Sequence, residues 1–305
     1  MKATRESYGE ALVSLGEKYK DIVVLDADLA EATKTIEFKK KFPERFFDMG
    51  IAEQDLMGTA AGLALGGKIP FASTFAIFAS GRAYDQIRNS ICYSNLNVKI
   101  AATHAGITVG EDGASHQALE DIALMRAVPN MVVLSPSDDA ETKYLLEEAV
   151  KYKGPVYIRL ARPKTESIYE DGTKFEIGKA VCHGDGTDAT VIATGVTVIE
   201  ALKAQKELKE KGIDIRVIDA HTIKPIDKEV IIKAAKETNK IITIEDHSIV
   251  GGLGSAVCEV LSEEYPTKVT RIGIKDEFGQ SGKWDELMKH YGITAKNIIE
   301  KINNN

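Results

Sequence analysis

Short β-branched runs alternate with amphipathic helical patterns along the N-terminal half of the chain. This alternation is typical of parallel strands joined by crossover helices. The predicted strands are residues 22–26 (IVVLD), 97–102 (NVKIAA), 131–135 (MVVLS) and 156–161 (VYIRLA). The clearest helix, residues 139–154, opens on aspartate and closes on Gly154, and its apolar face is formed by Leu145, Leu146, Ala149 and Val150.

Residues 163–187 break this rhythm, because they carry proline, glycine and mixed charge. The alternation then resumes in the segments DATVIATG (188–195), VIEALKAQKELKEKG (198–212), IDIRVIDA (213–220), KIITIED (240–246), GGLGSAVCEVL (251–261) and VTRIGI (269–274). The pattern predicts an α/β fold of two three-layer α/β/α domains with mostly parallel sheets. We place the domains at residues 1–165 and 186–305, with a linker at residues 166–185.

Composition and charge narrow the classes of partner. The 305 residues are 44% hydrophobic and 28% charged, and the net charge is -7. Nucleic acids and anionic membrane surfaces require clustered lysine and arginine, so neither is expected as the main partner. The start, MKATRESYGE, has no apolar leader, and no run approaches the roughly 18 apolar residues of a membrane span. We expect a cytoplasmic protein.

Three features suggest metal or phosphate motifs but lack the required context. The cysteines, Cys92, Cys182 and Cys258, are far apart without CxxC spacing, which indicates buried thiols rather than a disulfide framework or a zinc site. GDG at residues 184–186 lies in the linker before a strand, and the next asparagine is Asn239, so we interpret it as a turn. GGLGSA at residues 251–256 lacks the third glycine of the dinucleotide fingerprint and is a weak phosphate-loop candidate.

An acid stands at an unusual place in the segment DMGIAEQDLMGTAAGLALGG, residues 48–67. Glu53 is followed by residues that are almost all Gly, Ala, Leu or Met, where an unpaired buried carboxylate is costly. Gly58, Gly62 and Gly66 then give a helix one nearly bare face. Each glycine costs a helix roughly 1 kcal/mol relative to alanine, so we expect another backbone to pack on this face. Tight internal packing and a subunit contact both fit the spacing.

The segment THAGITVGEDGASHQALED, residues 103–121, is the most informative. His104 stands at the end of a predicted strand, where open parallel sheets bind ligands, and His116 follows in a glycine-punctuated loop with Glu111 and Asp112 between them. The spacing matches none of the established metal patterns. Hydrogen bonding to a hydroxylated substrate is therefore preferred over a metal site.

Two other groups of side chains allow a structural and a functional interpretation. Phe71, Phe75 and Phe78 share a helical face if a helix extends over them, and such a stripe is more often core than ligand-stacking. Arg159 and Arg162 end the strand at residues 156–161. Solvated or ion-paired guanidinium groups are the common outcome, but two of them at the ligand edge of a sheet also suit a phosphate.

Several segments together resemble the C-terminal half of transketolases, in order and over nearly the whole chain. They are DMGIAEQ, STFAIFASGRAYDQIR, THAGITVGEDGASHQALEDIALMRAVPN, SPSD and EDHSIVGGLGSAV. GIAEQ alone also occurs in deoxyxylulose phosphate synthases and in beta subunits of 2-oxo acid dehydrogenases, but the paired-histidine loop favours transketolase. The resemblance implies a pyrimidine-binding domain followed by the transketolase C-terminal domain. It further implies the small subunit of a split enzyme, in a heterotetramer with two copies of each chain.

The resemblance also implies roles for individual residues. Glu53 is the acid that shares a proton with N1′ of thiamine diphosphate, so that the cofactor's own 4′-amino group removes the C2 proton. The other cofactor positions are Phe75 and Phe78, around the aminopyrimidine, and Asp28. His104, His116 and Asp112 match residues that contact substrate hydroxyl and carbonyl groups, whereas Arg5 and Arg162 match arginines that bind sugar phosphate. Mg²⁺ (or Ca²⁺) is expected on the N-terminal-half partner subunit, which carries the diphosphate-binding domain.

The implied activity is transfer of a two-carbon ketol unit between sugar phosphates. The alternatives are a 2-oxo acid dehydrogenase beta subunit and a non-catalytic module that keeps the fold. Some positions depart from the family pattern: Ala52 and Gln54 replace an arginine and a histidine, and Gly81 stands where an aromatic residue is common. In DLAEAT, residues 28–33, the usual phosphate-binding serine is missing. The departures concern sugar preference and leave Glu53 in place.

Overall fold

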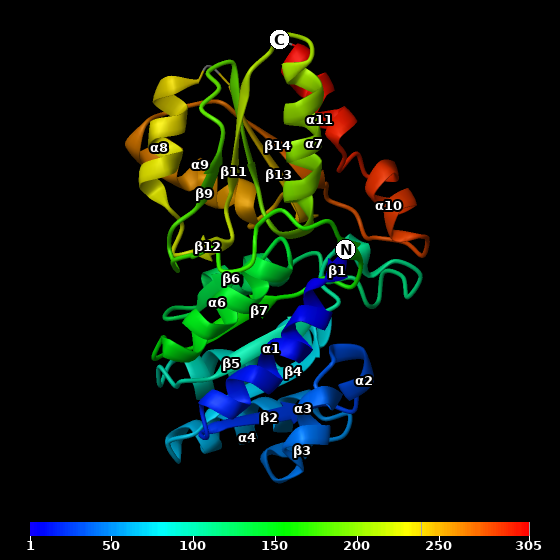
Figure 1. Cartoon of the computed structure of the whole chain (residues 1–305), viewed down its shortest axis with the longest axis vertical. Coiled ribbons are helices and arrows are strands. Elements are labelled where there is room, and N and C mark those ends of the chain that lie inside the picture. The colour runs from blue at the N-terminus through cyan, green and yellow to red at the C-terminus, as the bar shows by residue number, and fades with distance from the viewer. Residues whose placement is uncertain (239, 305) are drawn as a thin grey trace.

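The computed structural model describes residues 1–238 and 240–304. Two mainly parallel sheets lie one beyond the other along the molecule, with helices around each (Figure 1). The first sheet has the order β12-β6-β7-β5-β4-β2-β3, with only β12 antiparallel to its neighbour. Its strands are β2 (Ile22–Asp26), β3 (Phe46–Asp48), β4 (Ile69–Phe75), β5 (Lys99–Thr103), β6 (Val132–Leu134), β7 (Val156–Arg159) and β12 (Thr222–Lys224).

Helices cover both faces of the first sheet, which is why its central strands are buried at every position. Along β2, Ile22 and Val24 pack on one face with α1 (Thr4–Lys18), α3 (Ile36–Lys41) and α6 (Asp139–Lys151). Val23 and Leu25 pack on the opposite face with α4 (Glu53–Leu65) and α5 (Asp121–Ala127). The short helix α2 (Ala30–Thr33) follows β2 at the carboxyl end of the sheet.

The second sheet has the order β14-β13-β10-β11-β9, with β9 antiparallel to β11. Helices α8 and α9 cover one face, and α7, α10 and α11 lie on the other (Figure 1). The elements are β9 (Val181–His183), β10 (Ala189–Ala193), α7 (Val198–Lys209), β11 (Ile215–Asp219), α8 (Lys228–Glu237), β13 (Ile241–Ser248), α9 (Leu253–Glu264), β14 (Val269–Ile274), α10 (Trp284–His290) and α11 (Ala295–Asn303). The predicted α/β fold class is confirmed.

The two halves are tied together by a strand that crosses the expected boundary. β12 comes from the C-terminal half of the chain but pairs with β6 of the first sheet. Within the first domain, a small antiparallel ladder joins β1 (Lys2–Ala3) at its start to β8 (Lys164–Thr165) at its end. β9 lies inside the segment interpreted as linker, so the second sheet begins earlier than the sequence pattern indicated. Among the described residues no helix is both long and apolar enough to cross a membrane.

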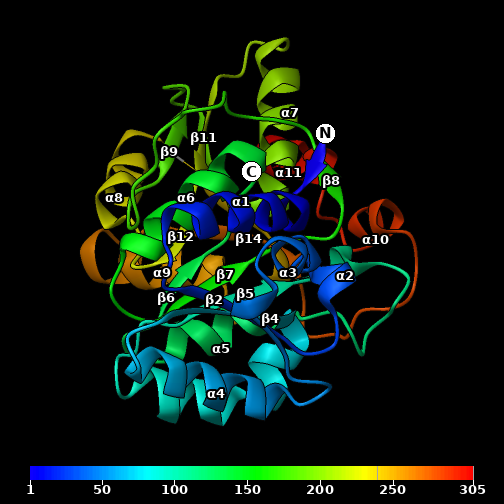
Figure 2. The same ribbon diagram turned by 60° about the horizontal axis from the view of Figure 1, so that its bottom comes forward.

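Three expectations from the sequence need correction. The phenylalanine stripe is not helical, since Phe71 and Phe75 lie on β4 and Phe78 begins a π-helical segment, Phe78–Arg82. Of the thiols only Cys92 is buried; Cys258 is half-buried and Cys182 exposed. The glycine face of α4 is not packed internally. No described atom lies within 4 Å of a Cβ built on Gly58 or Gly62, and α4 lies on the outside of the molecule (Figure 2).

A buried carboxyl pair lies where the two halves meet. The Ser137 hydroxyl lies 2.8 Å from Glu141 Oε2 and 2.9 Å from Asp219 Oδ2, and the Tyr169 hydroxyl donates to the same Asp219 oxygen at 2.8 Å. A serine hydroxyl carries one proton and cannot donate to both acids, so one of the two contacts requires a protonated carboxyl group. Burial accordingly raises the pKa of Glu141 well above its usual value and raises the pKa of Asp219 to about 7.

This pair predicts a specific dependence of stability on pH. In the folded chain Asp219 stays protonated at pH values at which the unfolded chain has already lost this proton. The contribution of Asp219 to the free energy of unfolding is therefore fully present below the ordinary aspartate pKa and is lost as the pH rises through about 7. Relative to the Asp219→Asn variant, the natural chain should lose about 3 kcal/mol of unfolding free energy between pH 4.5 and pH 8. Urea denaturation across that range measures the difference. The exposed control Asp185→Asn should show a flat difference, and a flat difference for Asp219→Asn would disprove the shared proton.

Candidate active site

The predicted site residues gather at the carboxyl edge of the first sheet. Phe75 is the last residue of β4, and His104 follows the end of β5 with a left-handed backbone, φ 55°. Glu53 begins α4, where the helix N-terminus favours a negative charge. Because parallel strands present their carboxyl ends at one edge, residues separated by about 50 positions in the sequence come together.

Aromatic rings connect these elements. Phe75 stacks on His104 with ring centroids 3.9 Å apart and lies nearly parallel to Phe78 at 5.8 Å. His116, from the glycine-punctuated loop, meets Phe78 edge-on at 5.4 Å. The phenylalanine pair and the histidine pair, which the sequence analysis treated as two groups, therefore line one continuous surface. Phe78 opens the π-helical segment, a rare form that often occurs at functional sites.

Glu53 is buried and has a partner that sequence reasoning missed. Its relative exposure is 5%, and its Oε1 accepts a hydrogen bond from Arg82 Nη1 at 3.0 Å. The guanidinium carbon of Arg82 lies 4.1 Å from the centroid of the Phe78 ring, a cation–π distance. The Arg82 carbonyl accepts from the side-chain amide of Gln54 at 3.2 Å. The buried carboxylate, treated as unpaired in the sequence interpretation, is thus compensated by a cation.

Cations collect around His104. Burial is the main cause that lowers the pKa of His104 to about 3, and Arg5, Arg162, His116 and Lys34 lower it further. His104 is therefore a neutral imidazole, whose Nδ1 lies 2.9 Å from the Thr103 hydroxyl. Arg5 Nη1 lies 3.5 Å from His104 Nε2 and donates to the Ala32 carbonyl at 2.8 Å. The arrangement suits an anionic group on a hydroxylated ligand.

Lys34 is a second residue that sequence reasoning missed. It has a left-handed backbone, φ 72°, and a Cβ built on Gly9 of α1 would lie 2.6 Å from the Lys34 carbonyl oxygen. Within the described part of the chain, no carboxylate forms an ion pair with the Lys34 ammonium group. The sequence around Lys34 does not indicate that its charge acts on His104, because the position of Lys34 depends on the close packing of α1 against it.

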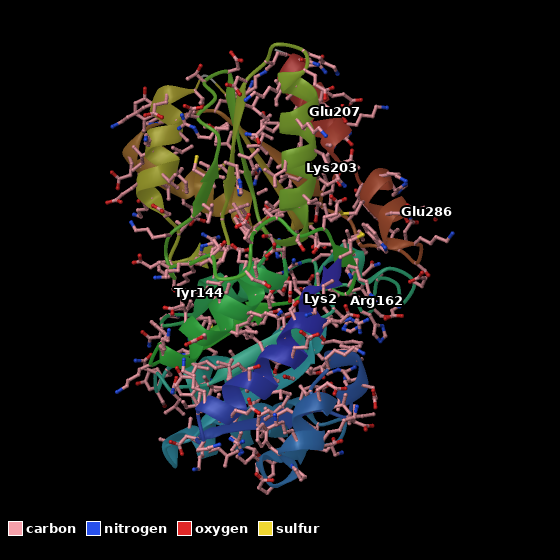
Figure 3. The ribbon with its side chains drawn as sticks, viewed as in Figure 1. Lys2, Tyr144, Arg162, Lys203, Glu207 and Glu286 are labelled. Atoms are coloured by element: carbon pink, nitrogen blue, oxygen red, sulfur yellow. The ribbon has the colours of Figure 1, made fainter. Side chains whose placement is uncertain are left out.

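Arg162 and the acidic residues of the loop pair with one another. Arg162 Nη1 lies 3.1 Å from Glu111 Oε2 and 4.0 Å from Asp112 Oδ1, and it also donates to the Val109 carbonyl. In Figure 3, Arg162 lies at the level where the two halves of the molecule meet. Across the described residues, no three His, Cys, Asp or Glu side chains form a group that could hold a metal ion.

Asp28 lies beyond the end of its strand rather than within it. β2 ends at Asp26, and Asp28 is exposed with a left-handed backbone, φ 61°. The buried Asp26 shapes this turn, since its carboxylate accepts from the Leu29 amide at 2.7 Å and from the hydroxyls of Thr33 and Thr35 at 2.7 and 2.8 Å. Asp26 thereby positions both Asp28 and the segment that ends in Lys34.

The second sheet supports the histidine loop through a buried ion network. Arg159 Nε lies 3.0 Å from Asp121 Oδ2, and Arg159 Nη2 lies 3.0 Å from Asp246 Oδ1, which belongs to β13. Asp246 Oδ2 accepts from the Thr108 hydroxyl at 2.7 Å. A Cβ on Gly106, φ 76°, would lie 1.7 Å from Asp246, so only glycine fits there. The phosphate interpretation of Arg159 is therefore wrong, because this guanidinium is buried between two carboxylates.

The N-terminus of α9, which the GGLGSA segment forms, is likewise occupied by a side chain of the protein. Glu245 accepts hydrogen bonds from the amides of Leu253 and Gly254 at 2.7 and 2.9 Å, at the N-terminus of α9. A Cβ on Gly252 would lie 2.0 Å from Glu245 Oε2. The helix terminus that a phosphate would use is occupied by a carboxylate of the chain itself.

Comparisons with known proteins relate both halves of the chain to one family. Residues 1–167 match the family model of the transketolase pyrimidine-binding domain, and residues 178–298 match that of the transketolase C-terminal domain. The chain belongs to the transketolase family. The resemblance proposed from the sequence is confirmed, and transketolases as a family use thiamine diphosphate.

Relatives of similar length occur as separate transketolase chains. A putative transketolase C-terminal section of Methanocaldococcus jannaschii is 57% identical over 304 residues, which are 99% of this chain and 95% of that protein. A 6-deoxy-6-sulfo-D-fructose transketolase subunit of a Clostridium species is 41% identical over 97% of this chain and 92% of its own length. A solved structure described as a split gene transketolase, inactive beta4 tetramer, has 53% identity, a TM-score of 0.93 and coverage of 99% and 97%.

The buried network makes Arg159→Met a test of how the histidine loop is held. Removal of the guanidinium leaves Asp121 and Asp246 buried without their cation, so the free energy of unfolding should fall by about 3 kcal/mol. Urea denaturation measures this loss, and amide hydrogen exchange at residues 106–110 should become faster. Lys151→Met, which breaks only exposed pairs, should change neither quantity. An Arg159→Met variant with natural stability and loop exchange would show that the network does not hold the loop.

Proposed function

We propose that this chain is the pyrimidine-binding subunit of a split, thiamine diphosphate-dependent transketolase. Residues 1–165 would bind the aminopyrimidine, residues 166–185 would connect, and residues 186–305 would form the C-terminal domain. The reaction is transfer of a two-carbon ketol unit from a ketose phosphate to an aldose phosphate. The observation that carries the proposal is the buried Glu53 carboxylate beside the surface lined by Phe75, Phe78, His104 and His116.

The residues around Glu53 fit an aminopyrimidine. A planar, delocalised cation, the Arg82 guanidinium, already lies over the Phe78 ring and donates to Glu53 Oε1. A pyrimidine ring that carries a proton at N1′ has the same two requirements, an aromatic face and a buried carboxylate. When bound, thiamine diphosphate supplies the carbon nucleophile and the electron sink. Glu53 would hold the proton at N1′, and Phe75 and Phe78 would orient the ring; Asp28 would lie near the cofactor.

The substrate end would use the cations and the histidine loop. Arg5, Arg162 and Lys34 surround His104 and favour an anionic terminus on the sugar. The Clostridium relative is named for a sulfo sugar rather than a sugar phosphate, which fits recognition of a terminal anion by charge. Neutral His104, with His116, would donate hydrogen bonds to substrate hydroxyl and carbonyl oxygens, and Asp112 would accept one from a donor-sugar hydroxyl.

The complementary half would come from a second polypeptide. Relatives of this length are described as a C-terminal section, a subunit and a split gene product. We propose a partner that carries the diphosphate-binding domain and the ligands of Mg²⁺ (or Ca²⁺), in a cytoplasmic complex with two copies of each chain. The open glycine face of α4, at Gly58 and Gly62, would serve self-association, because backbones approach closely where side chains are missing.

Partner dependence is the first test of this function. The purified chain should fold, self-associate, bind thiamine diphosphate weakly and show no transfer between xylulose 5-phosphate and ribose 5-phosphate. Addition of a diphosphate-domain subunit with Mg²⁺ should restore transfer, since the Mg²⁺ held by that subunit supplies most of the electrostatic attraction for the diphosphate. Titration calorimetry and a coupled transfer assay measure both effects. Full activity of the chain alone would refute the split enzyme, and turnover of pyruvate alone would favour a dehydrogenase beta subunit.

Glu53→Gln tests the acid itself. Glutamine keeps the shape of the side chain but has no acidic proton to share with N1′, so turnover in the assembled complex should fall by at least about 100-fold. The melting temperature and the circular dichroism spectrum should stay near those of the natural chain. Asp55→Asn, an exposed position on the same helix, is the matched control and should keep its activity. Near-normal turnover of Glu53→Gln would show that this acid is structural.

A further inference from the structure

We infer that Arg82 occupies the place of the aminopyrimidine ring and sets the affinity of this chain for its cofactor. This inference rests on the proposed function. Two contacts define the place: the Arg82 guanidinium donates to Glu53 Oε1 at 3.0 Å and stacks on Phe78 with 4.1 Å to the ring centroid. The cofactor's pyrimidine ring would need the same carboxylate oxygen and the same aromatic face. Ring and guanidinium therefore compete.

The side chains of Glu53 and Arg82 differ in how deeply they are buried, and this difference decides which of them can move. The Glu53 side chain is 6% exposed, whereas the Arg82 side chain is 53% exposed. A carboxylate buried to this degree requires a donor at all times, because an uncompensated buried charge is costly. Arg82 is free to turn into solvent, where a guanidinium is well hydrated. Arg82 is thus the residue of the pair that moves away when the pyrimidine ring of the cofactor binds.

The backbone around Arg82 is arranged to let its side chain move while its main chain stays. The Arg82 carbonyl is held by the Gln54 side chain, and the residue ends the π-helical segment Phe78–Arg82. Gly81 precedes it, and no described atom lies within 4 Å of the place that a Cβ would take there. Gln54 and Gly81 are two of the positions at which this sequence departs from the family pattern. One departure thus holds the Arg82 carbonyl from α4, and the other directly precedes Arg82 in the chain.

The chemistry of the guanidinium and of the pyrimidine ring predicts how a substitution of Arg82 changes the affinity for thiamine diphosphate. Arg82→Met removes the charge and the donor but keeps an apolar chain over Phe78. Cofactor binding then no longer has to break an ion pair and a cation–π contact, so the dissociation constant for thiamine diphosphate should decrease about fivefold. Without added cofactor, the variant should melt at a lower temperature than the natural chain, because Glu53 has lost its cation.

The experiment is a titration of thiamine diphosphate and Mg²⁺ into the full chain assembled with its diphosphate-domain partner, by calorimetry. Tighter binding by Arg82→Met, together with an unchanged affinity of the exposed control Arg88→Met, supports the inference. In the Glu53→Gln background, Arg82→Met should change the affinity much less, because the ion pair no longer exists. Equal or weaker binding by Arg82→Met alone would overturn the inference and leave the proposed function intact. Failure of the natural complex to bind the cofactor would overturn both.

Discussion

A buried set of charges between the two sheets holds the candidate active site in shape. Arg159 at the end of β7 links Asp121, which begins α5, to Asp246 on β13, and Asp246 reaches the histidine loop through Thr108. Charges this deeply buried are tolerated only as a complete set, because each alone would lose its hydration without compensation. The second half of the molecule thus supports the site through the Asp246 carboxylate. The loop backbone at Gly106 packs directly against this carboxylate.

On this foundation the site divides into two ends of opposite character. At one end, the Arg82 guanidinium joins the buried Glu53 carboxylate to the Phe78 ring, and we propose this end for a planar nitrogen heterocycle that carries a proton. The other end gathers Arg5, Arg162 and Lys34 around a neutral His104, an environment for an anionic hydroxylated ligand. The chain as a whole is acidic, with a net charge of -7, so these few local cations rather than the overall field would attract the substrate.

Periodicity was sufficient to predict the α/β class, and the strand-end argument placed His104, with His116 in the following loop, at the ligand edge. Phe75 and Phe78 were assigned to the site only through the resemblance to transketolases, because the helical stripe expected over the phenylalanines does not form. The sequence could not show the pairing of Glu53 with Arg82, because the two residues are 29 positions apart and meet only through tertiary packing. Lys34 was missed for the same reason, since it is placed by the approach of α1. The sequence left Arg159 open between ion pairing and phosphate binding, because the two acids that pair with it come from different domains. β9 was missed because three residues of an antiparallel edge strand carry too little pattern to stand out from a linker.

The Glu53 carboxylate and the Phe78 face together form the proposed seat of the cofactor's pyrimidine ring. The most direct measurement is a crystal structure of the chain assembled with a diphosphate-domain partner, thiamine diphosphate and Mg²⁺. We expect N1′ within hydrogen-bond distance of Glu53, the ring against Phe78, and the Arg82 side chain turned away. A pyrimidine ring seated elsewhere, or one that leaves the Arg82 to Glu53 bond unbroken, would contradict this assignment.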